Sequence, residues 1–217
     1  TALAADSSII YIDGISGSDN NNGDSEESAV QTLSKALESA GTDGEIYVCG
    51  TVTVDSSMNL SNVTLTRASG FTGTMLKITG ENTTVNMENV TIDGNKNEVT
   101  DATGALVQVE DGATVNIKEG TALRNNHARG LMIFGKNVAA NELITTVNMS
   151  GGEISGNGNF ANSSSEGGGV WLNYNCVFNL SDGSIKNNEA SFGAGVYVFS
   201  INNEAQAPGK FVMTGGA

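Results

Sequence analysis

The stretch Thr146–Asn157, Thr-Val-Asn-Met-Ser-Gly-Gly-Glu-Ile-Ser-Gly-Asn, decides the fold because it recurs along the chain. Thr84–Asn95 reads Thr-Val-Asn-Met-Glu-Asn-Val-Thr-Ile-Asp-Gly-Asn, and Val177–Asn188 reads Val-Phe-Asn-Leu-Ser-Asp-Gly-Ser-Ile-Lys-Asn-Asn. Thr114–Asn125 is a looser copy, with Ala122 where the others carry Ile. The sequence is therefore an array of related units rather than a single unrepeated pattern.

The copies return at a nearly constant interval. Met58–Leu65 is a weak first copy, and Lys210–Ala217 begins another. The aliphatic residue that closes the first strand of each copy recurs every 27 to 33 residues, at Leu60, Met87, Ile117, Met149, Leu180 and Met213. A repeat of this length, in which each unit stacks only on its neighbours, is typical of a solenoid.

Each repeat contains three short strand-like segments. In Val85-Asn86-Met87 the apolar residues alternate with a polar one, which predicts side chains alternately inside and outside. The second segment contains Ile92 or its copies, and the third is Leu76–Ile78, Val107–Val109, Leu131–Ile133, Val170–Leu172 or Val196–Val198. The six-residue period of a left-handed β-helix is absent. We therefore expect an all-β, right-handed, single-stranded parallel β-helix over residues 45–217, with three strands per coil.

Asparagine also recurs after the second strand of each repeat, at Asn95, Asn125, Asn157 and Asn188. Asn tolerates the left-handed backbone conformation that a corner requires. In stacked coils, equivalent amides can hydrogen-bond from one coil to the next. The pattern predicts an Asn ladder at this corner.

Residues 8–44 read as a separate N-terminal cap. Ser8–Asp13 is a strand candidate, and an amphipathic helix is expected over Glu26–Ala40. Asp24 and Glu27 form an Asp-x-x-Glu capping box, and Gly41 is a natural stop. An open sheet end exposes unpaired backbone groups and apolar surface, so a helix placed before the first coil would cover it.

Composition limits the classes of partner. The 217 residues include 28 Gly and one Pro, which favours many tight turns over a proline-rich linker. A net charge of −14 disfavours nucleic acid and anionic membranes as partners, because phosphate binding needs a basic surface. No apolar run approaches the ~20 residues of a membrane-spanning helix.

The start of the chain resembles the end of a secretory signal peptide. Thr1-Ala2-Leu3-Ala4-Ala5 contains an Ala-x-Ala pattern, so residues 1–7 are expected to be a signal remnant or else a disordered start. Cys49 and Cys176 lie several coils apart, beyond disulfide reach, and are expected to be separate thiols. The last repeat stops in mid-coil, which favours a piece of a longer chain that contributes further coils or domains.

Several motifs resemble those of pectate-lyase-type right-handed β-helix proteins. They are Tyr-Ile-Asp-Gly at residues 11–14, the helix pattern Val30–Leu37, and Val90-Thr-Ile-Asp-Gly-Asn. The later repeats, such as Met149–Asn157 followed by Gly167-Gly-Gly-Val-Trp, resemble bacterial cell-surface adhesin-like proteins. They are also similar to the Gly-Gly-x-Ile repeats of polymorphic outer-membrane proteins. The resemblance implies a pectin lyase-like fold and leaves the activity open, because one fold serves many functions.

The connection between the second and third strands varies from repeat to repeat, and variable loops on a regular scaffold concentrate function. Stacking would bring six charged or polar residues to one edge, namely Glu98, Asp101, His127, Arg129, Glu166 and Glu189. Two carboxylates could serve a glycoside hydrolase, and Arg129 with acids that hold calcium could serve a polysaccharide lyase. The recognised polygalacturonase motifs are absent, so solvated loop charges without a catalytic role are the competing interpretation.

An aromatic column offers a non-catalytic alternative. Trp171 and Tyr197 occupy equivalent outward positions of consecutive repeats, with Tyr174 nearby. Exposed flat aromatic faces suit sugar rings, so these three residues are candidates for glycan binding. The competing interpretation is an ordinary cross-strand pair or a patch covered by another domain.

A metal site is a further candidate. Asp13, Asp19 and Asp24 share one Gly-rich loop, but the ligand spacing of an EF-hand calcium loop is absent. Turn-forming Asp residues are the favoured interpretation, with calcium left possible and no other cofactor expected. Taken together, the sequence predicts a secreted or cell-surface domain of bacterial type that binds a polysaccharide or host glycan without catalysis. A polysaccharide lyase or glycoside hydrolase and a purely structural spacer are the alternatives.

Overall fold

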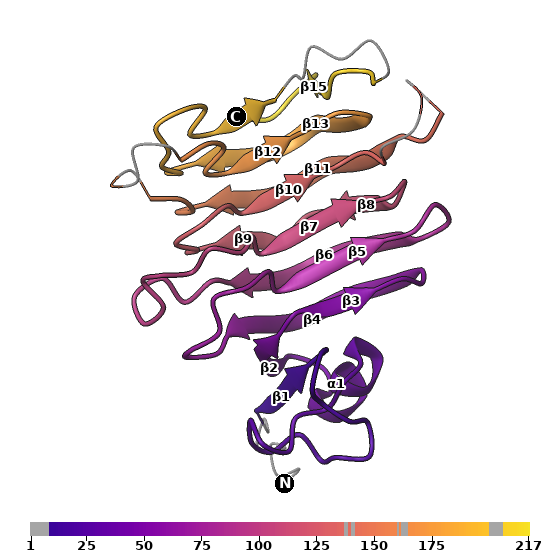
Figure 1. The fold of residues 1–217 in the computed structure, drawn as a ribbon, viewed down its shortest axis with the longest axis vertical. Coiled ribbons are helices and arrows are strands. Elements are labelled where there is room, and N and C mark those ends of the chain that lie inside the picture. The colour runs from indigo at the N-terminus through magenta and orange to yellow at the C-terminus, as the bar shows by residue number, and fades with distance from the viewer. Residues whose placement is uncertain (1–8, 137–138, 140–141, 160, 162–164, 200–205) are drawn as a thin grey trace, which may run out of the picture.

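The chain folds into parallel β-sheets whose strands are stacked along the molecule. The computed structural model describes residues 9–136, 139, 142–159, 161, 165–199 and 206–217. The expected signal remnant at residues 1–7 lies outside them. Figure 1 shows the strands rising in successive rungs from the N-terminal to the C-terminal end, with the single labelled helix beside the first strands. Within the described residues, no helix is long and apolar enough to cross a membrane.

The larger sheet contains nine strands in the described part of the chain. Neighbouring strands follow one another in chain order, and β8 and β9 both pair with β6 on one side and with β11 on the other. The strands are β1 (Ile10–Asp13), β2 (Gly44–Gly50), β4 (Met58–Arg67), β6 (Thr84–Asp93), β8 (Thr114–Ile117), β9 (Ala122–Arg124), β11 (Thr145–Ser155), β13 (Cys176–Lys186) and β15 (Lys210–Met213).

The smaller sheet contains six strands of the described residues, again in chain order. They are β3 (Val52–Val54), β5 (Leu76–Thr79), β7 (Val107–Glu110), β10 (Leu131–Ile133), β12 (Val170–Leu172) and β14 (Val196–Val198). Every neighbouring pair in both sheets is parallel. The chain therefore visits the two sheets alternately, and we call one visit to both sheets a layer.

The predicted register of the apolar columns is confirmed. The residues that mark the repeat pair in sequence across β4, β6, β8, β11, β13 and β15, as Leu60, Met87, Ile117, Met149, Leu180 and Met213. The third segments pair in the same way through the smaller sheet. Except at the C-terminal end, where Val198 and Met213 are exposed, their inward aliphatic side chains belong to one apolar cluster. Burial at ~25 cal/mol per Å² of apolar surface is the main stabilising term for such stacked strands.

The expectation of three separate strands per repeat is wrong in most layers. The first and second segments form one continuous strand in β4, β6, β11 and β13. They separate only in β8 and β9, where the second inward residue is Leu123, not Ala122 as the sequence alignment implied. Leu123 comes six residues after Ile117, whereas Ile92 comes five after Met87. The extra residue interrupts the strand and explains why this repeat resembles the others least.

The helix predicted over residues 26–40 is wrong in its first half, because α1 spans only Leu33–Ala40. Val30 was expected on the apolar face of the helix, but it lies extended and forms a parallel bridge with Ile12. Its amide donates to the carbonyl of Tyr11 at 3.0 Å. This backbone pairing with β1 prevents the helix from starting earlier.

The capping box expected at Asp24 is also absent. Thr32 is the N-cap, and its side chain accepts a hydrogen bond from the amide of Lys35 at 3.2 Å. The helix ends at Gly41, as predicted, where the backbone has a positive φ. Its buried residues, Leu33 and Ala36, belong to the main apolar cluster and pack toward β1 and β2.

Both cysteines are free thiols, as the sequence predicts. Cys49 is half-buried in β2, and Cys176 is buried in β13. Burial raises the pKa of each thiol to about 12. Since the thiolate is the reactive form, neither cysteine is placed to act as a nucleophile.

Candidate functional site

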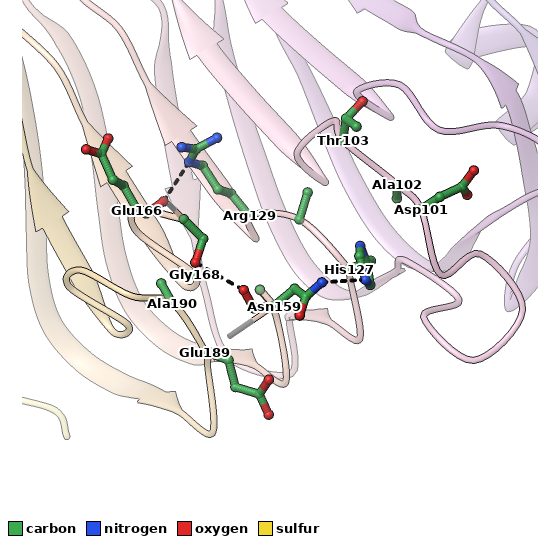
Figure 2. Close-up of a pocket in the computed structure, with 13 residues that line it drawn as sticks. Asp101, Ala102, Thr103, His127, Arg129, Asn159, Glu166, Gly168, Glu189 and Ala190 are labelled. Atoms are coloured by element: carbon green, nitrogen blue, oxygen red, sulfur yellow. Dashed lines mark hydrogen bonds between the residues drawn. The ribbon is translucent and has the colours of Figure 1, made fainter. Parts of the chain in front are cut away.

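The edge at which the chain leaves the larger sheet for the smaller one contains a pocket of about 240 Å³. It is lined by segments from four successive layers, which follow β6, β9, β11 and β13. Figure 2 shows its side chains, with Asp101 and His127 on one side and Glu189 and Asn159 on the other. We call this site the edge pocket, and its polar lining residues are Asp101, Thr103, His127, Arg129, Asn159, Ser165, Glu166 and Glu189.

Of the six residues predicted to gather here, five line the edge pocket: Asp101, His127, Arg129, Glu166 and Glu189. They come together because equivalent turn segments stack one above another. Glu98, expected on the same edge, is not part of the lining. The stacking prediction is thus confirmed for these five residues, whereas the catalytic roles proposed for them stay predictions.

A left-handed residue makes the corner below the pocket in each layer. Its positive φ is found at Asn95, Asn125, Gly156 and Asn187. The predicted ladder is confirmed between Asn157 and Asn188, whose side-chain amides hydrogen-bond at 3.1 Å. It is wrong at Asn95 and Asn125, because the prediction mixed two neighbouring positions of the turn. Asn95 and Asn125 belong to the left-handed position, and Asn157 and Asn188 to the residue after it.

The residue after the left-handed position carries the actual ladder, which consists of Asn126, Asn157 and Asn188. The Asn157 side chain accepts from the Asn126 amide at 3.0 Å, and Asn188 accepts from the Asn157 amide at 3.0 Å. The Asn157 side chain also donates to the Leu123 carbonyl at 3.0 Å. Asn126 and Asn157 are fully buried. The ladder fixes the spacing of the turns that carry the pocket residues.

The arginine at position 67 supports the pocket from inside and was missed in the sequence. Arg67 is fully buried, and burial lowers its pKa to about 10. Its guanidinium donates to the carbonyl of Gly73, to that of Gly104 at 3.3 Å, and to the Asn126 side chain at 3.2 Å. It also lies 5.3 Å from the centre of the Phe71 ring. Strand alternation, which places Arg67 inward like Leu65, is the signal that would have revealed it.

Asn126 connects Arg67 to the pocket wall. Its side-chain amide donates to the carbonyls of Gly104 and Arg129, at 2.9 and 2.8 Å. Gly104 follows the segment of Asp101, and Arg129 closes the segment of His127. Arg67 and Asn126 thus tie together the two turns that form one side of the edge pocket.

Arg129 is held between the loop after β11 and Trp171, the aromatic residue of β12. Its Nε donates to the carbonyl oxygen of Glu166 at 2.8 Å, and its guanidinium lies 5.6 Å from the Trp171 ring centre. Burial lowers the pKa of Arg129, and the nearby Glu166 carboxylate opposes that shift. The Glu166 carboxylate also accepts from Trp171 Nε1 at 3.3 Å. Glu166 is therefore already engaged by protein donors.

The predicted exposed aromatic platform is wrong at its centre. Trp171 and Tyr197 are paired in register as expected, but Trp171 is only 9% exposed. Its ring packs between Phe134, at 5.1 Å, and Phe199, at 5.8 Å between ring centres. These phenylalanines follow β10 and β14, so alternation within the strands could not place them.

The other two aromatic candidates lie outside the pocket lining. Tyr197 is half-buried, and burial together with the nearby Glu166 carboxylate raises its pKa. Tyr174 is half-buried in the turn after β12, and its carbonyl accepts from the Gly135 amide at 2.8 Å. The roles proposed for Tyr174 and Tyr197 in glycan binding stay predictions.

The carboxylates proposed for metal binding serve the N-terminal turns. Asp13 accepts from the amides of Ile15 and Ser16, at 2.9 and 3.0 Å. Asp24 accepts from the Ser28 hydroxyl at 2.6 Å. In the part of the chain that the structure describes, no group of three or more His, Cys, Asp or Glu side chains is placed to hold a metal ion.

Asp19 closes the same loop onto the start of α1. Its carboxylate accepts from the amides of Gln31 and Thr32, at 2.9 and 2.8 Å, and from the Thr32 hydroxyl at 2.7 Å. Burial alone would raise the pKa of Asp19, but the hydrogen bonds from Thr32 and Gln31 outweigh it and lower the pKa. The turn-forming interpretation of these Asp residues therefore has a direct structural basis.

The edge pocket combines hydrogen-bond donors and acceptors of both charges. Asp101 and Glu189 supply carboxylates, and Arg129 and His127 supply nitrogen groups. The Lys96 ammonium donates to the Gly158 carbonyl at 2.7 Å and lies 4.0 Å from Glu189. Chemically, this lining suits a ligand rich in hydroxyl groups, since each hydroxyl both donates and accepts.

Comparison of the chain with protein-family models, with curated proteins and with solved structures found no match.

Proposed function

We propose that the chain is a right-handed parallel β-helix solenoid and that α1 covers its N-terminal end. The support is the chain order of two all-parallel sheets around one apolar interior. α1 buries Leu33 and Ala36 toward the first strands of the larger sheet. The pectate-lyase-type motifs around Tyr11 and Val90 agree with the same architecture.

We further propose that the domain is an exported, adhesin-like cell-surface module that binds a glycan without chemical turnover. The observation that carries this proposal is the edge pocket, in which four layers contribute paired donors and acceptors to one cavity of about 240 Å³. Polar groups that converge in a concave site are the usual basis for orienting a small ligand. The excess of negative charge favours a neutral sugar over an acidic one.

A glycan array probed with the purified domain tests this function. Neutral glycans are expected to bind, and Asp101→Ala combined with Glu189→Ala should weaken binding at least tenfold. Glu119→Ala removes an exposed carboxylate outside the pocket lining and serves as the matched control. Binding that survives the double change would contradict the site, and silence of the whole array would favour a structural spacer.

A polysaccharide lyase or glycoside hydrolase is the second candidate, favoured by the presence of Asp101, Glu189 and Arg129 in the lining of one pocket. A glycosidase needs two carboxyl groups at a defined separation, one of which acts as an acid. Assays for new reducing ends and for unsaturated uronates, run on the polysaccharides of the array, separate this candidate from binding alone. If the domain cleaves a polysaccharide, and if Asp101→Asn or Glu189→Gln abolishes that cleavage, the enzymatic function replaces the binding proposal.

A further inference from the structure

The single histidine of the chain lies in the edge pocket, and one of its ring nitrogens faces an asparagine amide. His127 Nε2 lies 2.8 Å from Asn159 Nδ2. His127 follows β9, whereas Asn159 follows β11 one layer further along. Figure 2 shows this contact joining the two sides of the pocket. Which of the two nitrogens donates depends on how the Asn159 amide is oriented.

A second hydrogen bond settles that orientation. The backbone amide of Ala161 donates to Asn159 Oδ1 at 2.8 Å. A backbone N–H can only donate, so the oxygen of the Asn159 side chain must face Ala161. The NH₂ group then faces the imidazole. Because an amide NH₂ can only donate, His127 Nε2 must accept, and an accepting Nε2 carries no proton.

The remaining ring nitrogen must therefore carry the proton of the neutral imidazole. Within the described residues, His127 Nδ1 has no hydrogen-bond partner in the protein, and in Figure 2 it lies on the side of the ring away from Asn159. His127 is half-buried in the pocket wall, in the same lining as Asp101. An N–H donor and a carboxylate acceptor in one lining can bind the same ligand hydroxyl, one from each side.

Resting on the glycan-binding function proposed above, we propose that His127 is the specificity-determining donor of the edge pocket. Asn159 holds it as a neutral imidazole that offers Nδ1–H to a hydroxyl of an uncharged sugar. A second proton on the ring would place Nε2–H against the Asn159 NH₂ group, two donors face to face. The contact between the two layers would then break, and the Asn159 side chain would turn away from His127.

The charges around His127 act on the imidazole in both directions, some favouring the neutral ring and others the charged ring. The carboxylates of Asp101, Glu166 and Glu189 line the same pocket and favour a charged ring, whereas the Arg129 guanidinium disfavours it. The Lys96 ammonium lies beside Glu189 and Gly158. Glu166 is already occupied by Trp171, so the carboxylates that remain for the ligand are Asp101 and Glu189.

Nitrogen NMR of the full chain tests the inference without any ligand, since one histidine gives one set of imidazole signals. The spectra at pH 8 are expected to show the proton on Nδ1. Asn159→Ala removes the donor that fixes this tautomer, so the nitrogen signals should move toward a mixture of the two neutral forms. Asn159→Asp replaces the amide with a carboxylate that can only accept, so the proton should move to Nε2.

Asn20→Asp adds the same charge in the N-terminal loop and should leave the proton on Nδ1. A proton on Nε2 in the wild type at pH 8, or the same tautomer in the wild type and in Asn159→Asp, would overturn the inference. Either result leaves glycan binding itself untouched. Conversely, an empty glycan array would remove the proposed function, while the NMR tautomers still decide how Asn159 holds His127.

Discussion

The outer face of the larger sheet and the edge pocket are built from the same repeats, but they use polar side chains in opposite ways. On the sheet face, Asn86, Asn116, Asn148 and Asn179 each donate to the amide of the layer before, at 2.8 to 2.9 Å. At the edge the copies differ in length and sequence, and polar groups such as those of Asp101 and Glu189 face a cavity. Polar side chains at regularly repeated positions thus hydrogen-bond to one another, whereas those at irregular positions are available for a ligand.

The largest effect is expected where the regular interior supports the irregular edge. Arg67→Met should lower the free energy of unfolding by about 3 kcal/mol, because the carbonyl of Gly104 and the Asn126 side chain lose a buried donor. Urea denaturation measures the change. Arg124→Met is the matched control, since Arg124 is an outward arginine whose ion pair with Asp93 is partly exposed and should contribute less than about 1 kcal/mol. Equal losses in both variants would contradict the supporting role of Arg67.

The next contrast is between two asparagine ladders. The buried ladder consists of Asn126, Asn157 and Asn188, and the outward ladder, on the face of the larger sheet, includes Asn86, Asn116, Asn148 and Asn179. Asn157→Ala should cost about 2 kcal/mol, because the Asn126 amide and the Leu123 carbonyl would lose a buried partner. Asn148→Ala removes an equivalent amide from the sheet face, where water can replace the lost bonds, and should cost less than about 1 kcal/mol. The pair of urea titrations would contradict the distinction between buried and outward ladders if the two costs were equal.

The sequence predicted the interior well because inward positions recur with fixed identity. The pairing from Leu60 to Met213 follows from the repeat alone, and the single slip, at Ala122, comes from one extra residue in that repeat. The helix boundary was wrong because a backbone bridge between Val30 and Ile12 outweighs the local helical pattern. A local sequence pattern does not indicate backbone pairing with a residue elsewhere in the chain.

The membership of the edge pocket was also predictable, since turn segments of stacked repeats must lie side by side. The contacts that support and occupy its residues were not predictable. Arg67 reaches Asn126 across 59 positions, and Trp171 is covered by Phe134 and Phe199 from neighbouring layers. Such contacts depend on side chains in different layers, so no periodicity in one repeat indicates them.

A change within the pocket should separate binding from stability. Glu189→Gln is expected to alter the free energy of unfolding by no more than about 0.5 kcal/mol, because this carboxylate is largely exposed and its ion pair with Lys96 is long. The dissociation constant for the neutral glycan found on the array should rise about tenfold, through loss of a charged acceptor. Glu119→Gln is the control for binding by calorimetry. A loss of stability without a loss of affinity would place Glu189 with the structural polar groups instead.

The smallest effect concerns an ion pair on the regular face. The Lys186 ammonium lies 2.6 Å from the Glu153 carboxylate, and this hydrogen bond, helped by Ser155, lowers the pKa of Glu153 from its ordinary value of 4.5. A lowered folded-state pKa means that the contribution is fully present above pH 4.5 and is lost as the pH falls through the folded value.

Glu153→Gln should therefore be less stable than wild type by under about 1 kcal/mol at pH 7, and the difference should shrink as the pH falls below 4.5. Urea denaturation at several pH values measures the difference. High salt should reduce it in part, since Lys186 is half exposed. A gap between the two proteins that persists in acid would mean that Glu153 acts through packing of its side chain. In that case even exposed charged residues of the repeats would contribute to stability through packing rather than through their charge.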